Sequence, residues 1–119
     1  GPTKPPETRF IGKWNIDPLK TLSKAETDRK VVQQNYAAVG KYLVQFGYQF
    51  TDSGVLKYGR SQRYRTIGTY QVLDVSDGKV LLNFNYTDAR EGRSEKIALS
   101  YASGDLIMTR GKHTTVLGR

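Results

Sequence analysis

Few side chains in this sequence could carry catalysis. His113 is the only histidine, and there is no cysteine. The polar residues that precede it, Ser100, Ser103 and Asp105, belong to an ordinary turn pattern around a glycine. Nucleophilic catalysis needs a nucleophile, a base and an orienting group that converge, and no recognised motif supplies them here. We therefore expect a protein that is not an enzyme.

Motifs for metals and cofactors are equally scarce. One histidine without cysteine cannot build a typical zinc site. Asp74 and Asp77 flank a turn but lack the spacing of a calcium-binding loop. Gly111-Lys112 lacks the upstream glycines of a phosphate-binding loop. We expect neither a metal nor a cofactor.

Basic residues dominate the polar composition. Nineteen Lys and Arg against eleven Asp and Glu give a formal net charge of +8. They concentrate in the segment KYGRSQRYR at 57–65. A second basic loop, with Arg90, Arg93 and Lys96, is diluted by Asp88 and Glu91. Arginine binds phosphates and carboxylates through paired hydrogen bonds. The basic rim expected to meet an anionic partner consists of Lys57, Arg60, Arg63, Arg65, Arg90 and Arg93.

This charge leaves several partner classes open. The simplest interpretation is a pair of solvated loops that keep the protein soluble. A more specific interpretation is a surface that binds acidic protein, glycan or lipid headgroups. Tyr58 and Tyr64 could stack on nucleobases, but the motifs of single-strand-binding domains are missing, which argues against nucleic acid.

Alternating apolar residues and turn signals predict a series of strands. The expected strands cover 9–16, 42–50, 55–58, 64–75, 79–87, 95–102, 105–110 and 113–117. Turn residues separate them, most clearly Asp52-Ser53-Gly54, Ser76-Asp77-Gly78 and Ser103-Gly104. Gly68 lies inside the longest strand and indicates a bend or bulge there.

One helix is expected between the first two strands. Ser23-Lys24-Ala25-Glu26 fits a capping box with Ser23 as the N-cap. Apolar residues at 25, 32, 36 and 39 then recur with helical spacing, so the predicted helix covers 24–39 and ends at Gly40. Its single apolar stripe allows two placements, as a lid over a barrel or as a brace on its outer wall.

About eight strands joined by short turns favour an all-β fold, an antiparallel up-and-down barrel that leaves no open edges. A barrel of this size has an interior that is filled by side chains or holds one small ligand. The residues expected to face that interior, and to line any ligand site within it, are Tyr48, Phe50, Tyr70, Leu82, Phe84, Leu99 and Tyr101.

Gly12-Lys13-Trp14 on the first strand resembles the Gly-x-Trp signature of lipocalin-like domains. The segment LSYASGDLIM at 99–108 is similar to a late hairpin of small bacterial lipocalin-like domains. The resemblance implies that Trp14 plugs one end of the barrel and that a late arginine, Arg110 or Arg119, packs across it. A helix after the first strand is more similar to fatty-acid-binding proteins, in which helices cap the barrel mouth.

The beginning of the chain suggests processing. Gly1-Pro2 is typical of a cleaved affinity tag, and 3–8 is polar and rich in proline. We therefore expect a tag scar and linker at 1–8 and a barrel domain at 9–119. The resemblance, with an upstream signal peptide or membrane anchor removed, implies an exported protein of the bacterial envelope that could meet a membrane surface through that anchor.

Two functions follow from these observations. The first is a non-catalytic binding module that holds a small hydrophobic or amphiphilic ligand in its barrel. The alternative is a filled barrel that acts as a protein-interaction or inhibitor domain and docks an acidic partner through the basic rim.

Overall fold

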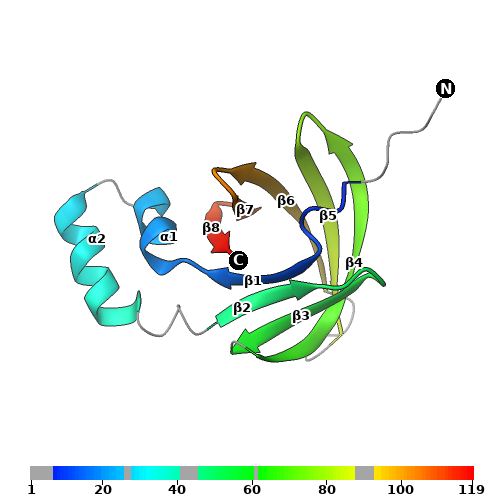
Figure 1. The fold of residues 1–119 in the computed structure, drawn as a ribbon, viewed down its shortest axis with the longest axis horizontal. Coiled ribbons are helices and arrows are strands. Elements are labelled where there is room, and N and C mark those ends of the chain that lie inside the picture. Colours follow the sequence, from blue (N-terminus) through cyan, green and yellow to red (C-terminus); the bar gives the residue numbers. More distant parts are fainter. Residues whose placement is uncertain (1–6, 26–27, 41–45, 61, 88–92) are drawn as a thin grey trace.

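The chain folds into a closed antiparallel barrel of eight strands that pair in sequence order. The computed structural model describes residues 7–25, 28–40, 46–60, 62–87 and 93–119, and Figure 1 shows the barrel with its helices to one side. The strands are β1 (Gly12–Ile16), β2 (Phe46–Phe50), β3 (Val55–Arg60), β4 (Arg63–Ser76), β5 (Lys79–Tyr86), β6 (Ser94–Ala102), β7 (Asp105–Arg110) and β8 (His113–Gly118). The predicted eight-stranded barrel is confirmed.

The turn chemistry explains this strand order. Asp77-Gly78 and Ser103-Gly104 both have positive φ at the two central positions, the geometry that matches the twist of a two-residue hairpin. The predicted irregularity near Gly68 is also present. Leu56 pairs with Gly68 and Lys57 with Thr66, so Ile67 is the extra residue of a bulge in β4.

The single helix predicted over 24–39 is wrong in number and in its start. Two helices occupy this region, α1 (Pro18–Ala25) and α2 (Arg29–Asn35), followed by a wide π-helical turn at Tyr36–Gly40. Asp17 precedes the first helix, and its Oδ1 accepts a hydrogen bond from the Lys20 amide at 3.0 Å. Pro18 is tolerated at the first helical position, where no amide donor is needed.

Ser23 therefore lies inside α1 rather than at an N-cap. Asp28 is the N-cap of α2, and its Oδ1 accepts from the Lys30 amide at 2.9 Å. Glu26 of the predicted capping box, and the start of the predicted strand at 42, lie outside the described residues. Within the part of the chain that is described, no helix is long and apolar enough to span a membrane.

Helix α1 braces the outer wall of the barrel. β1 pairs with β8 through only two residue pairs, Asn15 with Gly118 and Ile16 with Leu117. Beyond them, the Asp17 amide donates to the Val116 carbonyl at 2.8 Å, and the Val116 amide donates to Thr21 Oγ1 at 3.0 Å. The first turns of the helical segment thus complete the hydrogen bonding of β8, and α1 is a brace rather than a lid.

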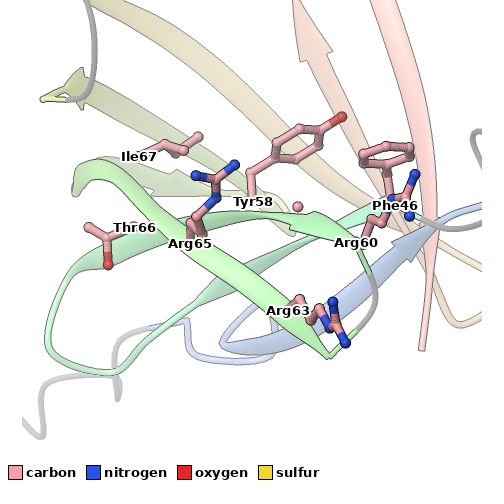
Figure 2. Close-up of a pocket in the computed structure, with 8 residues that line it drawn as sticks. Phe46, Tyr58, Arg60, Arg63, Arg65, Thr66 and Ile67 are labelled. Atoms are coloured by element: carbon pink, nitrogen blue, oxygen red, sulfur yellow. The ribbon is translucent and has the colours of Figure 1, made fainter.

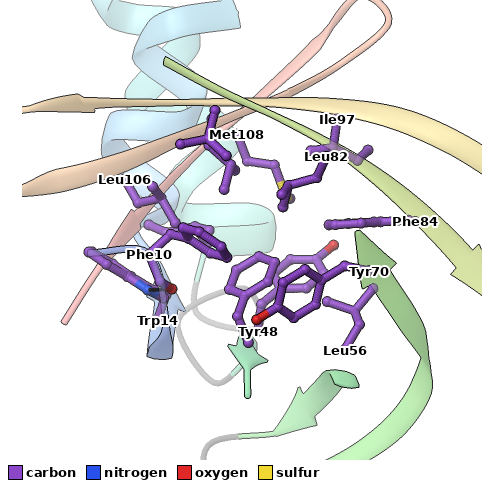
Figure 3. Close-up of a cluster of buried hydrophobic side chains, with 14 of the residues drawn as sticks. Phe10, Trp14, Tyr48, Leu56, Tyr70, Leu82, Phe84, Ile97, Leu106 and Met108 are labelled. Atoms are coloured by element: carbon purple, nitrogen blue, oxygen red, sulfur yellow. Dashed lines mark hydrogen bonds between the residues drawn. The ribbon is translucent and has the colours of Figure 1, made fainter. Parts of the chain in front are cut away.

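The interior is a continuous cluster of aromatic and aliphatic side chains (Figure 3). Phe50, Leu82 and Phe84 have no exposed surface. The Phe50 ring meets Tyr70 edge-on, with 5.6 Å between ring centroids, and lies 6.0 Å from the Phe84 ring. Every strand contributes at least one buried side chain to the core.

Gly68 provides a test of how closely β4 and β5 approach. A Cβ at this position would lie 2.0 Å from the Asn85 carbonyl oxygen, and overpacking of this kind destabilises proteins. We expect Gly68→Ala to lower the free energy of unfolding by at least about 2 kcal/mol in urea denaturation. Gly118→Ala is the matched control, since its Cβ would meet nothing closer than 3.7 Å. Equal stability of the two variants would contradict this close approach of the two strands.

Candidate ligand-binding site

The seven predicted interior residues all belong to the core cluster or pack against it. Tyr101 is half-buried. The other six are buried, namely Tyr48, Phe50, Tyr70, Leu82, Phe84 and Leu99. Their exposed fractions are 8% or less, so little room is left beside them for a bound molecule. A ligand-binding role for these residues stays a prediction.

Trp14 lies at the closed end of the barrel. Its Nε1 donates a hydrogen bond to the Phe10 carbonyl at 2.7 Å. The Arg119 guanidinium lies over the indole, 4.2 Å from Cζ to the ring centroid, and donates to the Arg9 and Ile11 carbonyls. Of the two arginines considered from the sequence, Arg119 therefore occupies this position, while Arg110 lies at the opposite end.

The Arg119–Trp14 contact can be tested with the intrinsic fluorescence of the only tryptophan. We expect Arg119→Gln to lower the free energy of unfolding by about 1 kcal/mol, because it removes a cation–π contact and hydrogen bonds to two carbonyls. The Trp14 emission should shift to the red as water reaches the ring. Lys112→Gln removes the same charge at the other end of the barrel and should leave the emission unchanged; a matching shift would contradict the local contact.

The open end, or mouth, is formed where β1, β3, β5 and β7 finish and β2, β4, β6 and β8 begin. A pocket of about 630 Å³ lies there on the inner face of the β3–β4 hairpin. Its lining consists of Phe46, Tyr58, Gly59, Arg60, Arg63, Arg65, Thr66 and Ile67. Figure 2 shows Arg65 and Ile67 near Tyr58, Arg60 near Phe46, and Arg63 at the end of the hairpin.

Strand register places cationic and aromatic side chains on one face. Arg60 is opposite both Phe46 and Arg63, and Tyr58 is opposite Arg65. Side chains of directly opposed residues project to the same side of a sheet. The Phe46 and Tyr58 rings are stacked, with centroids 5.9 Å apart, so the pocket has an aromatic wall beside its guanidinium groups.

The three pocket arginines have no acidic partners among the described residues. Within the described residues, no carboxylate lies within 4.0 Å of the guanidinium of Arg60, Arg63 or Arg65. Arg60 and Arg63 also oppose each other across the hairpin, and like charges in this position destabilise a sheet. An anion bound in the pocket would remove this repulsion.

The remaining rim residues predicted from the sequence are placed differently. Lys57 is opposite Gln49 and Thr66, between the inward-facing Leu56 and Tyr58, and so faces the outer wall. Arg93 lies on the far side of the mouth, with Cζ 5.5 Å from the Tyr86 ring centroid. Arg90 lies outside the described residues.

A polar cluster on the opposite wall of the mouth was not predicted. Tyr86 Oη donates a hydrogen bond to Glu95, and Arg110 Nη1 lies 3.4 Å from that hydroxyl and 3.6 Å from Glu95 Oε1. Register explains the cluster, because Phe84 is opposite Glu95 and both face inward. The alternation of Glu95 with Ile97 and Leu99 was the available signal.

The environment of this cluster also raises the pKa of its tyrosine. Burial, followed by the hydrogen bond with Glu95, raises the pKa of Tyr86 to about 12. Burial likewise raises the pKa of Tyr48 despite the nearby positive charge of Arg110. Tyr86 is therefore a neutral hydrogen-bonding group at the mouth, not a base.

No family model, curated protein or solved structure matches the chain. Within the residues that the structure describes, no three His, Asp or Glu side chains gather in a way that could hold a metal ion. The function has to be inferred from the geometry of the mouth.

The raised pKa of Tyr86 predicts how stability depends on pH. Because the folded value of about 12 exceeds the ordinary value of 10.0, the stabilisation is complete below pH 10 and is lost as the pH rises toward 12. Burial also raises the pKa of Tyr101 to about 12, so it shares this window. We expect the free energy of unfolding to fall between pH 10 and 12.

Tyr86→Phe should make that decline shallower, because one of the contributing groups is removed. Tyr36→Phe, on the exposed helix surface, is the matched control and should keep the wild-type slope. Chemical denaturation at a series of pH values measures the slope for each protein. An unchanged slope in Tyr86→Phe would contradict the assignment.

Proposed function

We propose that this protein is a non-catalytic binding module that binds a small amphiphilic anion at the mouth of its barrel. The observation that carries the proposal is the pocket on the β3–β4 hairpin, where three arginines without acidic partners in the described residues adjoin an apolar wall. The apolar part of the ligand lies against Phe46, Tyr58 and Ile67. Its carboxylate or phosphate accepts hydrogen bonds from Arg60 and Arg65.

The chemistry of the pocket favours an amphiphile over a purely polar or purely apolar ligand. Phe46, Tyr58 and Ile67 are half-buried, whereas the guanidinium groups are exposed. A ligand that placed only charge here would leave the aromatic wall in water, and one without charge would leave the arginines unpaired. The volume of about 630 Å³ lies in the range of small-molecule sites.

The mouth is a better candidate than the interior predicted from the sequence. A ligand beside Phe50 or Leu82 would have to displace side chains that are completely buried, at a cost of several kcal/mol for each cavity opened. The pocket at the mouth requires no such displacement. We propose that the interior supports the site and that the ligand stays near the rim.

The packing of side chains at the closed end of the barrel supports the proposed relation to lipocalin-like proteins. Trp14 of the Gly-x-Trp segment is covered by the late Arg119, as the resemblance implied. The helical insertion after β1 differs from that resemblance. A lipocalin-like relation and an exported, envelope-associated location are both proposals that rest on this likeness.

Isothermal titration with dodecyl phosphate and dodecanoate, below their micellar concentrations, tests the pocket. We expect saturable binding that weakens at least tenfold in the double variant Arg60→Gln/Arg65→Gln, because charge-assisted hydrogen bonds are lost. Lys24→Gln/Lys79→Gln removes the same net charge away from the pocket and should bind as the wild type does.

Two outcomes would count against the proposal. If the wild-type protein binds neither amphiphile, the proposal is wrong. If both double variants lose affinity to the same extent, net charge alone attracts the ligand. Dodecan-1-ol, which has the same chain length, serves as the uncharged comparison. It should bind more weakly than either anion if the arginines take part.

A further inference from the structure

The charges of this protein are separated along the barrel axis. Six basic residues lie at or near strand ends around the mouth, against two acids among the described residues, Glu95 and Asp17, of which Asp17 directly follows β1 and accepts a hydrogen bond from the Lys20 amide of α1. The six basic residues are Arg60, Arg63, Arg65, Arg93, Arg110 and Lys112. The acids gather at the closed end, in or beside the turns between strands, and are Glu7, Asp52, Asp74, Asp77 and Asp105. The basic residues near them in the described chain are Arg9, Lys20, Lys24, Lys79 and Arg119, of which Arg9 and Lys20 are already paired with acids.

The basic residues surround the mouth rather than form one patch. They come from the β3–β4 hairpin, the start of β6 and the β7–β8 hairpin. Arg93, whose guanidinium lies over the Tyr86 ring, and Lys112, in the exposed turn before β8, do not line the pocket. These two residues extend the positive surface beyond what a single small anion would need.

From this arrangement we propose that the mouth docks on a lipid bilayer with anionic headgroups. A ring of cations around one end of the barrel, with acids at the other, orients the molecule in the field of a negative surface. The pocket then faces the bilayer. The inference rests on the proposed function, because the bilayer is the source of the amphiphile that the pocket binds.

The structure favours a bilayer over the other polyanions. Single-stranded nucleic acid is held by exposed aromatic rings on which bases stack. Tyr36 is the exposed aromatic residue of the described chain, and it directly follows α2, outside the strands of the barrel. The rings of Phe46, Tyr58 and Tyr86 at the mouth are half-buried and face inward. Tyr64 faces the outer wall of β4, but its ring is half-buried and its hydroxyl donates to Asn15 Oδ1 at 2.8 Å. An acidic protein would pair with the ring of cations, but it would not supply the amphiphile that the pocket is proposed to bind.

Vesicle flotation provides the test. The protein is mixed with vesicles of phosphatidylcholine alone, or of phosphatidylcholine with phosphatidylglycerol, at low and high salt. We expect binding only to the anionic vesicles and its release by salt, because surface charges are screened within about 10 Å at 0.1 M. Each rim cation near the surface contributes about fivefold to partitioning, from roughly 1 kcal/mol apiece.

Arg93→Gln/Lys112→Gln isolates docking from ligand binding, since neither residue lines the pocket. We expect this variant to lose about 25-fold in vesicle partitioning while it binds monomeric dodecyl phosphate as the wild type does. Lys24→Gln/Lys79→Gln, with the same net charge, should partition nearly as the wild type does. The emission of Trp14 verifies that each variant is folded.

The outcomes separate the two proposals. Equal loss of vesicle binding in both double variants, or equal binding to both kinds of vesicle, would overturn the docking inference. Stronger binding to poly-glutamate or to a single-stranded oligonucleotide than to anionic vesicles would also overturn it in favour of that partner. Vesicle binding without monomer binding would instead contradict the amphiphile pocket, and monomer binding without vesicle binding would leave the pocket intact and remove the docking.

Discussion

The seam between β1 and β8 is the constraint on which the rest of the structure depends. Two residue pairs close the barrel there, and a strand edge left open would attract other chains. Asp17 and Thr21 complete the ladder at Val116, and Lys20 ties the helix to Asp105 at 2.6 Å. Because these bonds hold α1 against the outer wall, the first helix cannot cover the mouth.

Local patterns explain why most of the barrel was predictable. Alternation of apolar residues with period two depends only on neighbours in the sequence, and Val80, Leu82 and Phe84 follow it throughout β5. Two-residue turns such as Ser103-Gly104 require positive φ at both positions, which restricts the residues that can form them. Strand order and the inward-facing set followed from these two signals.

The errors came from interactions that the sequence does not display. The capping-box pattern at Ser23 was a plausible helix start, but Asp17 is held at the β8 edge and starts the helix six residues earlier. Choosing Arg119 over Arg110 required knowing which end of the barrel each strand reaches. Glu95 faces the mouth because it is opposite Phe84 on the neighbouring strand, and the sequence does not display which residues pair between strands.

The energetics of the mouth are the physical basis for proposing that its arginines bind an anion. Like charges directly opposed in a hairpin, as at Arg60 and Arg63, cost roughly 0.2–1 kcal/mol. Each hydrogen bond from a guanidinium to an anion contributes about 1.5–3 kcal/mol, so one anion more than offsets the repulsion. The packed interior cannot respond in this way, since aromatic and aliphatic side chains fill it. We therefore place the proposed binding site at the rim, where the fold holds basic residues apart from the acids of the closed end.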